Sequence, residues 1–144
     1  MPNCGDILIS VEPCYGFRIL DGSKTVELRR RPVRVQPGTR MWIYITKPVA
    51  GVSAYAVIGA MHELQVTELW RRYGRDAGIT RSAFREYFQG RKKGHALVIE
   101  KVVLLTRTVA LGALRRRLGG FNPPQFFKKL TSESPELQVL RAAI

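Results

Sequence analysis

Three charged side chains near the start of the chain have the spacing of a binding or reactive group. Lys24, Glu27 and Arg29 follow directly after the turn residue Gly22. A guanidinium can hold phosphate, a carboxylate can accept from base amino groups, and a lysine can stabilise an oxyanion or act as a nucleophile. Because a carboxylate favours the ammonium form of a nearby lysine, we expect Lys24 to bind rather than act as a general base. If the protein is an enzyme, Lys24 and Glu27 are the candidate catalytic residues.

Glu27 and Arg29 are expected to share one face of a strand over residues 25–31 with Thr25 and Arg31, and Lys24 stands at the turn that leads into this strand. Val26 and Leu28 alternate with Glu27 and Arg29, so the apolar pair faces the core and the charged pair points the other way. Two interpretations of the charged face stay open. It is either a solvated surface, where an exposed ion pair contributes little, or the polar floor of a ligand cleft.

Other catalytic motifs are missing from the sequence. The two histidines are isolated, and there is no Ser–His–Asp or Cys–His arrangement and no cluster of metal ligands. The stretch GALRRRLGG (112–120) lacks the Gly-Lys-Ser/Thr that a phosphate-binding P-loop requires. We therefore expect no metal and no cofactor.

Positive charge dominates the composition. The chain has 24 Lys and Arg against 11 Asp and Glu, a formal net charge of +13. Such an excess predicts a polyanionic partner, with nucleic acid the first choice. Arg30 and Arg31 extend the charge beyond Arg29, and Tyr44 and Phe121 are candidates for stacking on a base. Further basic clusters occur at 71–85, 91–93, 115–117 and 128–129.

The length of 144 residues predicts one domain over 1–144, with its compact part at about 7–130 and a polar, frayed tail at 131–144. No apolar run is long enough to span a membrane, and the N-terminus does not have the pattern of a secretory signal. The expected location is the cytoplasm.

The hydrophobic periodicity predicts an α+β fold. Strands are expected at 7–12, 25–31, 40–47, 54–67 and 95–107, with a bend or bulge at Gly59. Helices are expected at 13–22, 68–74, 80–88, 110–118 and 122–130, with Thr67 capping the second and Asn122 the last. Because few strands alternate with crossover helices, we expect a small, mostly antiparallel β-barrel with peripheral helices.

The stretch SVEPCYGFRILDGSKTVELRRR (10–31) resembles the ASCH domain, a branch of the PUA-like superfamily. The family signature Gly-x-Lys-x-x-Glu-x-Arg is present as Gly22, Lys24, Glu27 and Arg29. The stretches RMWIYITKP (40–48), YFQGRKKGHALVIEKV (87–102) and LGGFNPPQFFKKL (118–130) are similar to it as well. The resemblance implies a PUA-like barrel with a cleft beside the signature, and binding of RNA or a nucleotide in that cleft.

Three functions stay open. The first is a module that binds RNA or a nucleotide through Gly22, Lys24, Glu27, Arg29, Arg30, Arg31, Tyr44 and Phe121. The second is a hydrolase. One branch of the family is similar to acetylcytidine amidohydrolases, whose pattern has threonine where this chain has Glu27 and needs a second carboxylate, here Asp76 or Glu86. Other relatives imply a ribonuclease, for which the sequence identifies no residues. The third is a protein-interaction module using residues 68–90.

Overall fold

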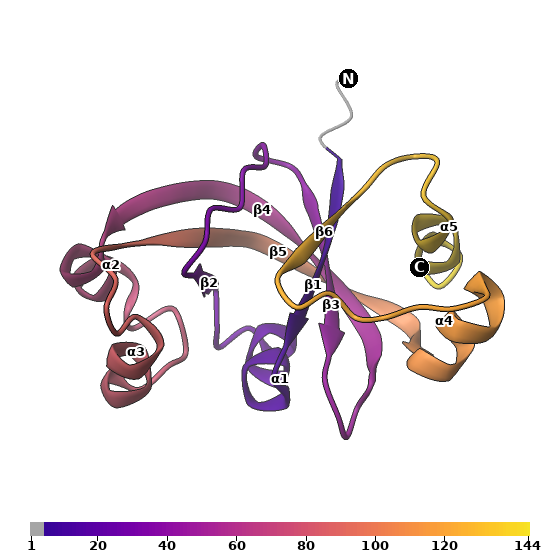
Figure 1. Ribbon diagram of the computed structural model, residues 1–144, viewed down its shortest axis with the longest axis horizontal. Helices are drawn as coiled ribbons and strands as arrows, with labels where there is room; N and C mark the ends of the chain where they lie inside the picture. Colours follow the sequence, from indigo (N-terminus) through magenta and orange to yellow (C-terminus); the bar gives the residue numbers. More distant parts are fainter. Residues whose placement is uncertain (1–4) are drawn as a thin grey trace.

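The computed structural model describes residues 5–144, which form one mixed sheet with helices around it (Figure 1). The strands are β1 Asp6–Val11, β2 Val26–Arg29, β3 Arg40–Ile45, β4 Gly51–Gln65, β5 Lys93–Ala110 and β6 Phe127–Leu130. The helices are α1 Pro13–Asp21, α2 Val66–Tyr73, α3 Arg81–Tyr87, α4 Leu111–Leu118 and α5 Pro135–Arg141. None of the helices between residues 5 and 144 is long and apolar enough to cross a membrane.

The six strands follow the order β2-β5-β4-β3-β1-β6. Only β1 and β3 run parallel among the described strand pairs, which confirms the mostly antiparallel α+β prediction. The register of β4 against β5 shifts between Ile58 and Ala60, which confirms an irregularity at Gly59.

The predicted closed barrel is wrong. β2 and β6 are the two edges of the sheet and do not pair with each other. The four residues of β2 pair only with β5, and charged side chains occupy the space between β2 and β1. The sheet is therefore curved but open at a seam, which we define as the space between β2 and the end of β1.

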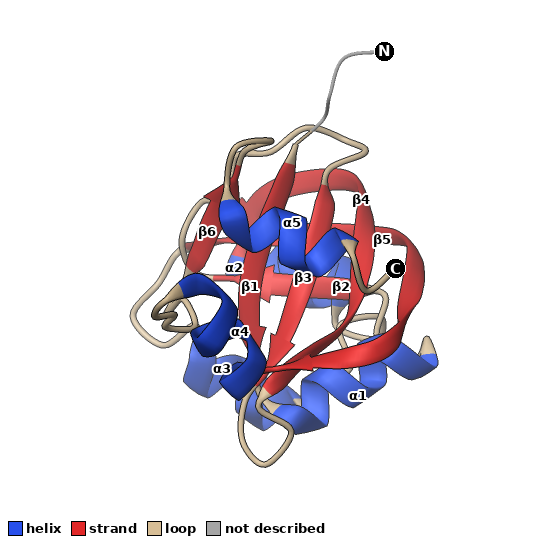
Figure 2. Ribbon diagram, turned by 90° about the vertical axis from the view of Figure 1, so that its right-hand side faces the viewer, coloured by secondary structure: helices blue, strands red, loops and turns tan. Residues whose placement is uncertain are grey.

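Alternating side chains divide the core between the two faces of the sheet. Ile7, Ile9 and Val11 of β1 face inward with Ile19 of α1, whereas Leu8 faces the other way. On that second face, α4 and α5 cover β1 and β3 (Figure 2). Val26 and Leu28 of β2 pack in a third cluster, against α2 and α3. The signature strand therefore turns its apolar face to the helical insertion and its charged face to the inside of the curved sheet.

The C-terminal quarter differs from the predictions. The predicted helix over 122–130 is wrong, since residues 122–126 form no regular element and 127–130 form β6, which pairs antiparallel with β1. Prolines are tolerated in the first turn of a helix, so the local pattern is compatible with one, but edge pairing with β1 overrides it. The predicted frayed tail is also wrong, because α5 buries Leu137 and Leu140 against the sheet.

Helix capping provides a modest stability prediction. The Thr80 side chain accepts a hydrogen bond from the Ala83 backbone N–H at 3.1 Å, whereas Thr67 lies inside α2 and does not cap it. We expect Thr80→Ala to lower the free energy of unfolding by about 1 kcal/mol, the usual cost of losing a capping oxygen. Thr67→Ala is the matched control and should cause no loss. Urea denaturation measures both, and equal effects would contradict the assignment of Thr80 as the cap.

Candidate functional site

The glycine of the signature ends a helix. Gly22 follows α1 with φ of 85°, in the left-handed region that glycine adopts without a steric penalty, and its N–H donates to the Ile19 carbonyl at 3.2 Å. This turn directs the chain toward Lys24. Gly22 is exposed and does not line the cavity described below, so its contribution is conformational.

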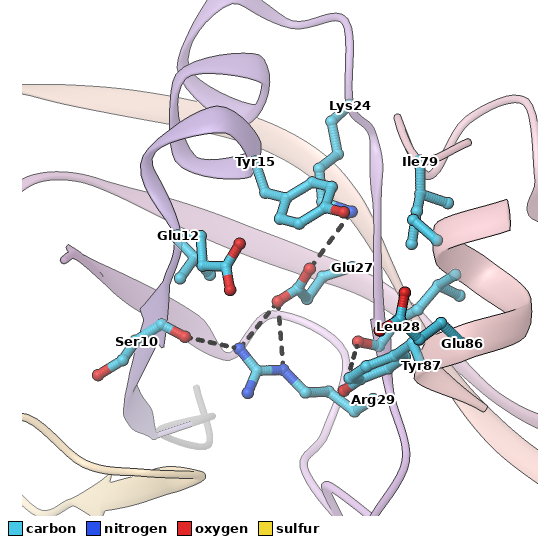
Figure 3. Close-up of a pocket in the computed structure, with 12 residues that line it drawn as sticks. Ser10, Glu12, Tyr15, Lys24, Glu27, Leu28, Arg29, Ile79, Glu86 and Tyr87 are labelled. Carbon is cyan, nitrogen blue, oxygen red and sulfur yellow. Dashed lines mark hydrogen bonds and ion pairs between the residues drawn. The ribbon is translucent and has the colours of Figure 1, made fainter. Parts of the chain in front are cut away.

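A cavity of about 390 Å³ lies at the seam (Figure 3). Its walls come from the end of β1, the start of α1, the signature segment, and α3 with the loop before it. The lining residues are Ser10, Val11, Glu12, Tyr15, Lys24, Glu27, Leu28, Arg29, Ile79, Ala83, Glu86 and Tyr87. This volume is within the range of small-molecule sites, and the mixture of two tyrosine rings with polar groups is typical of them.

Lys24 is buried and its ammonium is fully engaged. It donates to the carbonyl oxygens of Val26 at 2.8 Å and Ala77 at 2.5 Å. It also lies 3.3 Å from Oε1 of Glu27. These three partners use the three N–H bonds of the ammonium. Lys24 therefore joins the signature segment to the loop between α2 and α3.

Glu27 is shared between two cations. Its Oε1 faces Lys24, and its Oε2 accepts from Arg29 Nη2 at 2.8 Å and Arg29 Nε at 3.2 Å. The side chain of Glu27 is only 8% exposed and that of Arg29 14%. The charged face of β2 is thus a buried polar wall of the cavity, and the solvated-surface interpretation is wrong.

Arg29 bridges the seam. Its Nη2 donates to the Ser10 carbonyl of β1 at 3.2 Å, and its Nη1 donates to the Phe126 carbonyl at 3.3 Å. One guanidinium therefore holds β2 beside β1 and beside the segment that leads into β6. Among the described strands, β2 pairs with neither β1 nor β6. A second Nη1 hydrogen remains for a ligand.

The open side of the cavity has unpaired acidic groups. The carboxylates of Glu12 and Glu86 line it, and neither has a hydrogen-bond or ion-pair partner among residues 5–144. Tyr15 lies nearby, its ring centre 5.5 Å from the Lys24 ammonium. Burial, and then the acidic neighbours Cys14 and Glu12, raise the pKa of the Tyr15 hydroxyl above its ordinary 10.0, so it stays a hydrogen-bond donor at neutral pH.

The structure brings only part of the predicted site together. Arg30 and Arg31 are exposed and lie next to the cavity wall, each over an aromatic ring. Tyr44 and Phe121 are 3% and 9% exposed and belong to the cluster under α4 and α5. The expectation that their rings are available for stacking on a base is therefore wrong, because both side chains are buried in the core.

Several cavity residues were not predicted as site residues. Glu12, Tyr15 and Tyr87 reach the cavity from α1 and α3 or from just before them, and Ser10 from β1. Of the two acidic candidates for a second carboxylate, Glu86 lines the cavity and Asp76 does not. Asp76 instead contributes its backbone carbonyl, which accepts hydrogen bonds from the N–H groups of Thr25 and Val26. Glu86 and Tyr87 are neighbours in the sequence, but only the packing of α3 beside the signature segment brings them to the cavity.

The buried ammonium provides a pH prediction. Burial lowers the pKa of Lys24 below its ordinary 10.5, and Glu27 opposes this in part. As pH rises toward 10.5, the folded protein releases the Lys24 proton before the unfolded chain does, so this residue makes stability increase with pH in that interval. Relative to Lys24→Met, the wild type should gain unfolding free energy from neutral pH to about pH 10.5. Urea denaturation of both proteins measures this, and a constant difference would contradict it.

Comparisons with known proteins identify sequence relatives of this chain. Residues 7–117 match the family described as a domain of unknown function, DUF365. The chain is 34% identical over 136 residues to a Zymomonas mobilis protein named ASCH domain-containing ribonuclease, a match that covers 94% of this chain and 91% of the relative.

Solved structures match over nearly the whole chain. The crystal structure of ASCH from Zymomonas mobilis has a TM-score of 0.88 at 33% identity, covering 96% of each chain. A variant of that protein with serine replaced by alanine has a TM-score of 0.89 at 31% identity, covering 100% of each chain. Human THYN1, in complex with DNA containing 5-methylcytosine, has a TM-score of 0.53 at 13% identity, covering 96% of this chain and 97% of that one. This last match reflects the fold alone.

Proposed function

Because the chain belongs to the ASCH domain family, we propose that it binds RNA, with one base in the cavity at the seam and the phosphate backbone on the basic surface around it. One observation carries this proposal. A nucleoside-sized cavity opens on the surface of a protein with net charge +13, beside the exposed Arg30 and Arg31. The relative named a ribonuclease supports RNA as the partner.

The contacts favour a base over a phosphate inside the cavity. All three Lys24 donors have partners in the protein, and Arg29 is mostly occupied by Glu27 and two carbonyls. Three carboxylates face two cations among the lining residues, so the charge of the cavity favours a neutral base over a phosphate. Glu12 and Glu86 instead offer acceptors to base amino groups, and Tyr15 and Tyr87 offer rings. Lys24 and Arg29 then act as positioning residues.

Salt dependence tests the proposal. Fluorescence anisotropy of a labelled single-stranded RNA should show an affinity that falls linearly on a plot of log affinity against log salt, because phosphate contacts release counterions. Replacing Arg30 with alanine should reduce the slope by about 1 if that side chain neutralises one phosphate. A flat plot, or no binding at low salt, would overturn the proposal.

Cleavage of RNA is the second candidate function, favoured by the name of the relative. In the simplest route, the ribose 2′-oxygen bonds to the adjacent phosphorus as the bond to the 5′-oxygen breaks. A base must take the 2′-hydroxyl proton and an acid must protonate the leaving oxygen. The unpaired Glu86 carboxylate could accept the first proton, and the Tyr15 hydroxyl could donate the second.

An end-group assay tests cleavage. We expect products with a 2′,3′-cyclic phosphate, a rate reduced about 100-fold or more by Glu86→Gln, and no product from an RNA with a deoxyribose at the cleaved position. Intact RNA after incubation with the wild type would contradict cleavage and leave binding as the function.

A further inference from the structure

Two pairs of stacked cationic and aromatic side chains flank the end of β2. The Arg31 guanidinium lies 4.1 Å from the ring centre of Phe126, and the Arg30 guanidinium lies 5.0 Å from that of Tyr87. Tyr87 belongs to the cavity wall, but Phe126 does not line the cavity. Phe126 is 45% exposed and is one of the exposed large hydrophobic side chains of residues 5–144, with Phe17, Leu104 and Ile144.

The position of Phe126 is fixed relative to the cavity. Its carbonyl accepts from Arg29 Nη1 at 3.3 Å, and the Pro124 carbonyl accepts from the Ser10 hydroxyl at 2.7 Å. Arg29 and Ser10 both line the cavity. The exposed ring is therefore held directly beside the cavity by the same side chain that bridges the seam.

The pair has the chemistry of a nucleotide site. An exposed phenylalanine ring offers a face on which any base can stack, and a guanidinium stacked on the same ring keeps its N–H edges available for phosphate. The Arg31 side chain has no hydrogen-bond or ion-pair partner among residues 5–144, so these edges are unused.

We propose that Phe126 and Arg31 form a second nucleotide subsite, which binds the nucleotide next to the one in the cavity. The base of that nucleotide stacks on Phe126, and its phosphate accepts from Arg31. This inference rests on the proposed RNA binding and makes a run of at least two nucleotides the unit that the protein recognises.

The test compares ligands of two lengths. A single-stranded RNA of about four nucleotides should bind Phe126→Ala about 5- to 150-fold more weakly than wild type, the effect of losing one base–aromatic stack. Cytidine or adenosine 5′-monophosphate, which fills only the cavity, should bind both proteins equally. Phe126→Trp should retain the affinity for the longer RNA. Phe17→Ala is the matched control, since Phe17 is 50% exposed on α1 and does not line the cavity.

The outcomes separate this inference from the proposed function. If the wild type binds neither RNA nor nucleotide, the proposed function and the subsite both fail. If the wild type binds RNA and Phe126→Ala binds it equally well, only the subsite is overturned. If Phe126→Ala lowers the affinity for the monophosphates as much as the affinity for the RNA, the ring supports the cavity itself, and the proposal of a separate subsite is wrong. Arg31→Ala should weaken the longer RNA and reduce its salt dependence.

Discussion

Replacing Glu27 with alanine is expected to lower the free energy of unfolding by about 3–5 kcal/mol, because it leaves two buried cations without their shared carboxylate. Lys24 and Arg29 are 4% and 14% exposed in their side chains, so water cannot fully replace the lost partner. Chemical denaturation at neutral pH measures the loss. The circular dichroism spectrum establishes whether the variant is folded before it is denatured.

An exposed carboxylate provides the matched control. Glu68 pairs with Arg71 on the surface of α2. Because solvent screens that pair, Glu68→Ala should change stability far less than Glu27→Ala does. Equal losses from the two substitutions would contradict the view that burial, and not pairing alone, makes Glu27 important for stability.

Replacing all three charged residues of the signature should distinguish a loss of stability from a loss of RNA affinity. In the triple variant Lys24→Met, Glu27→Leu and Arg29→Met, no buried charge is left unpaired, so the protein should be more stable than Glu27→Ala. Its RNA affinity should nevertheless fall about 30- to 100-fold, the scale of losing a central binding group, because the polar wall that orients a base is gone. Anisotropy titration at fixed salt measures this.

A separate control is needed for the effect of the changed net charge on RNA affinity. The triple variant removes two positive charges and one negative charge, which lowers the net charge by one. Arg75→Met lowers the net charge by the same amount at an exposed position outside the cavity. If that variant loses as much RNA affinity as the triple variant, the effect is electrostatic and the cavity is not the binding site.

Local sequence patterns predicted the elements that form the signature. The proline at the start of α1, the glycine after it and the alternation of β2 are all short-range signals, and each one is confirmed. The alternation also placed Glu27 and Val26 correctly on opposite faces of β2. It did not reveal that the charged face is buried, since that face is enclosed by the end of β1, the start of α1 and the distant helix α3.

The parts that could not be predicted depend on contacts between distant segments. The stretch around Phe126 has the composition of a helix, yet its structure is decided by β1, more than a hundred residues earlier, which offers an unpaired edge. Tyr44 has a side chain of the type that stacks on bases, yet it is buried in the core cluster that includes residues of α4 and α5. Side-chain type alone could not distinguish a buried ring from a ring open to a ligand.

The bridge made by Arg29 has a mechanical consequence. Strand pairing joins neighbours in the sheet through many backbone hydrogen bonds, but at the seam, within residues 5–144, the guanidinium of Arg29 connects β2 to β1 and to the segment before β6. Displacing that side chain would therefore break hydrogen bonds and an ion pair but no ladder of the sheet. The width of the site is set by a side chain, whereas the shape of the scaffold is set by backbone pairing.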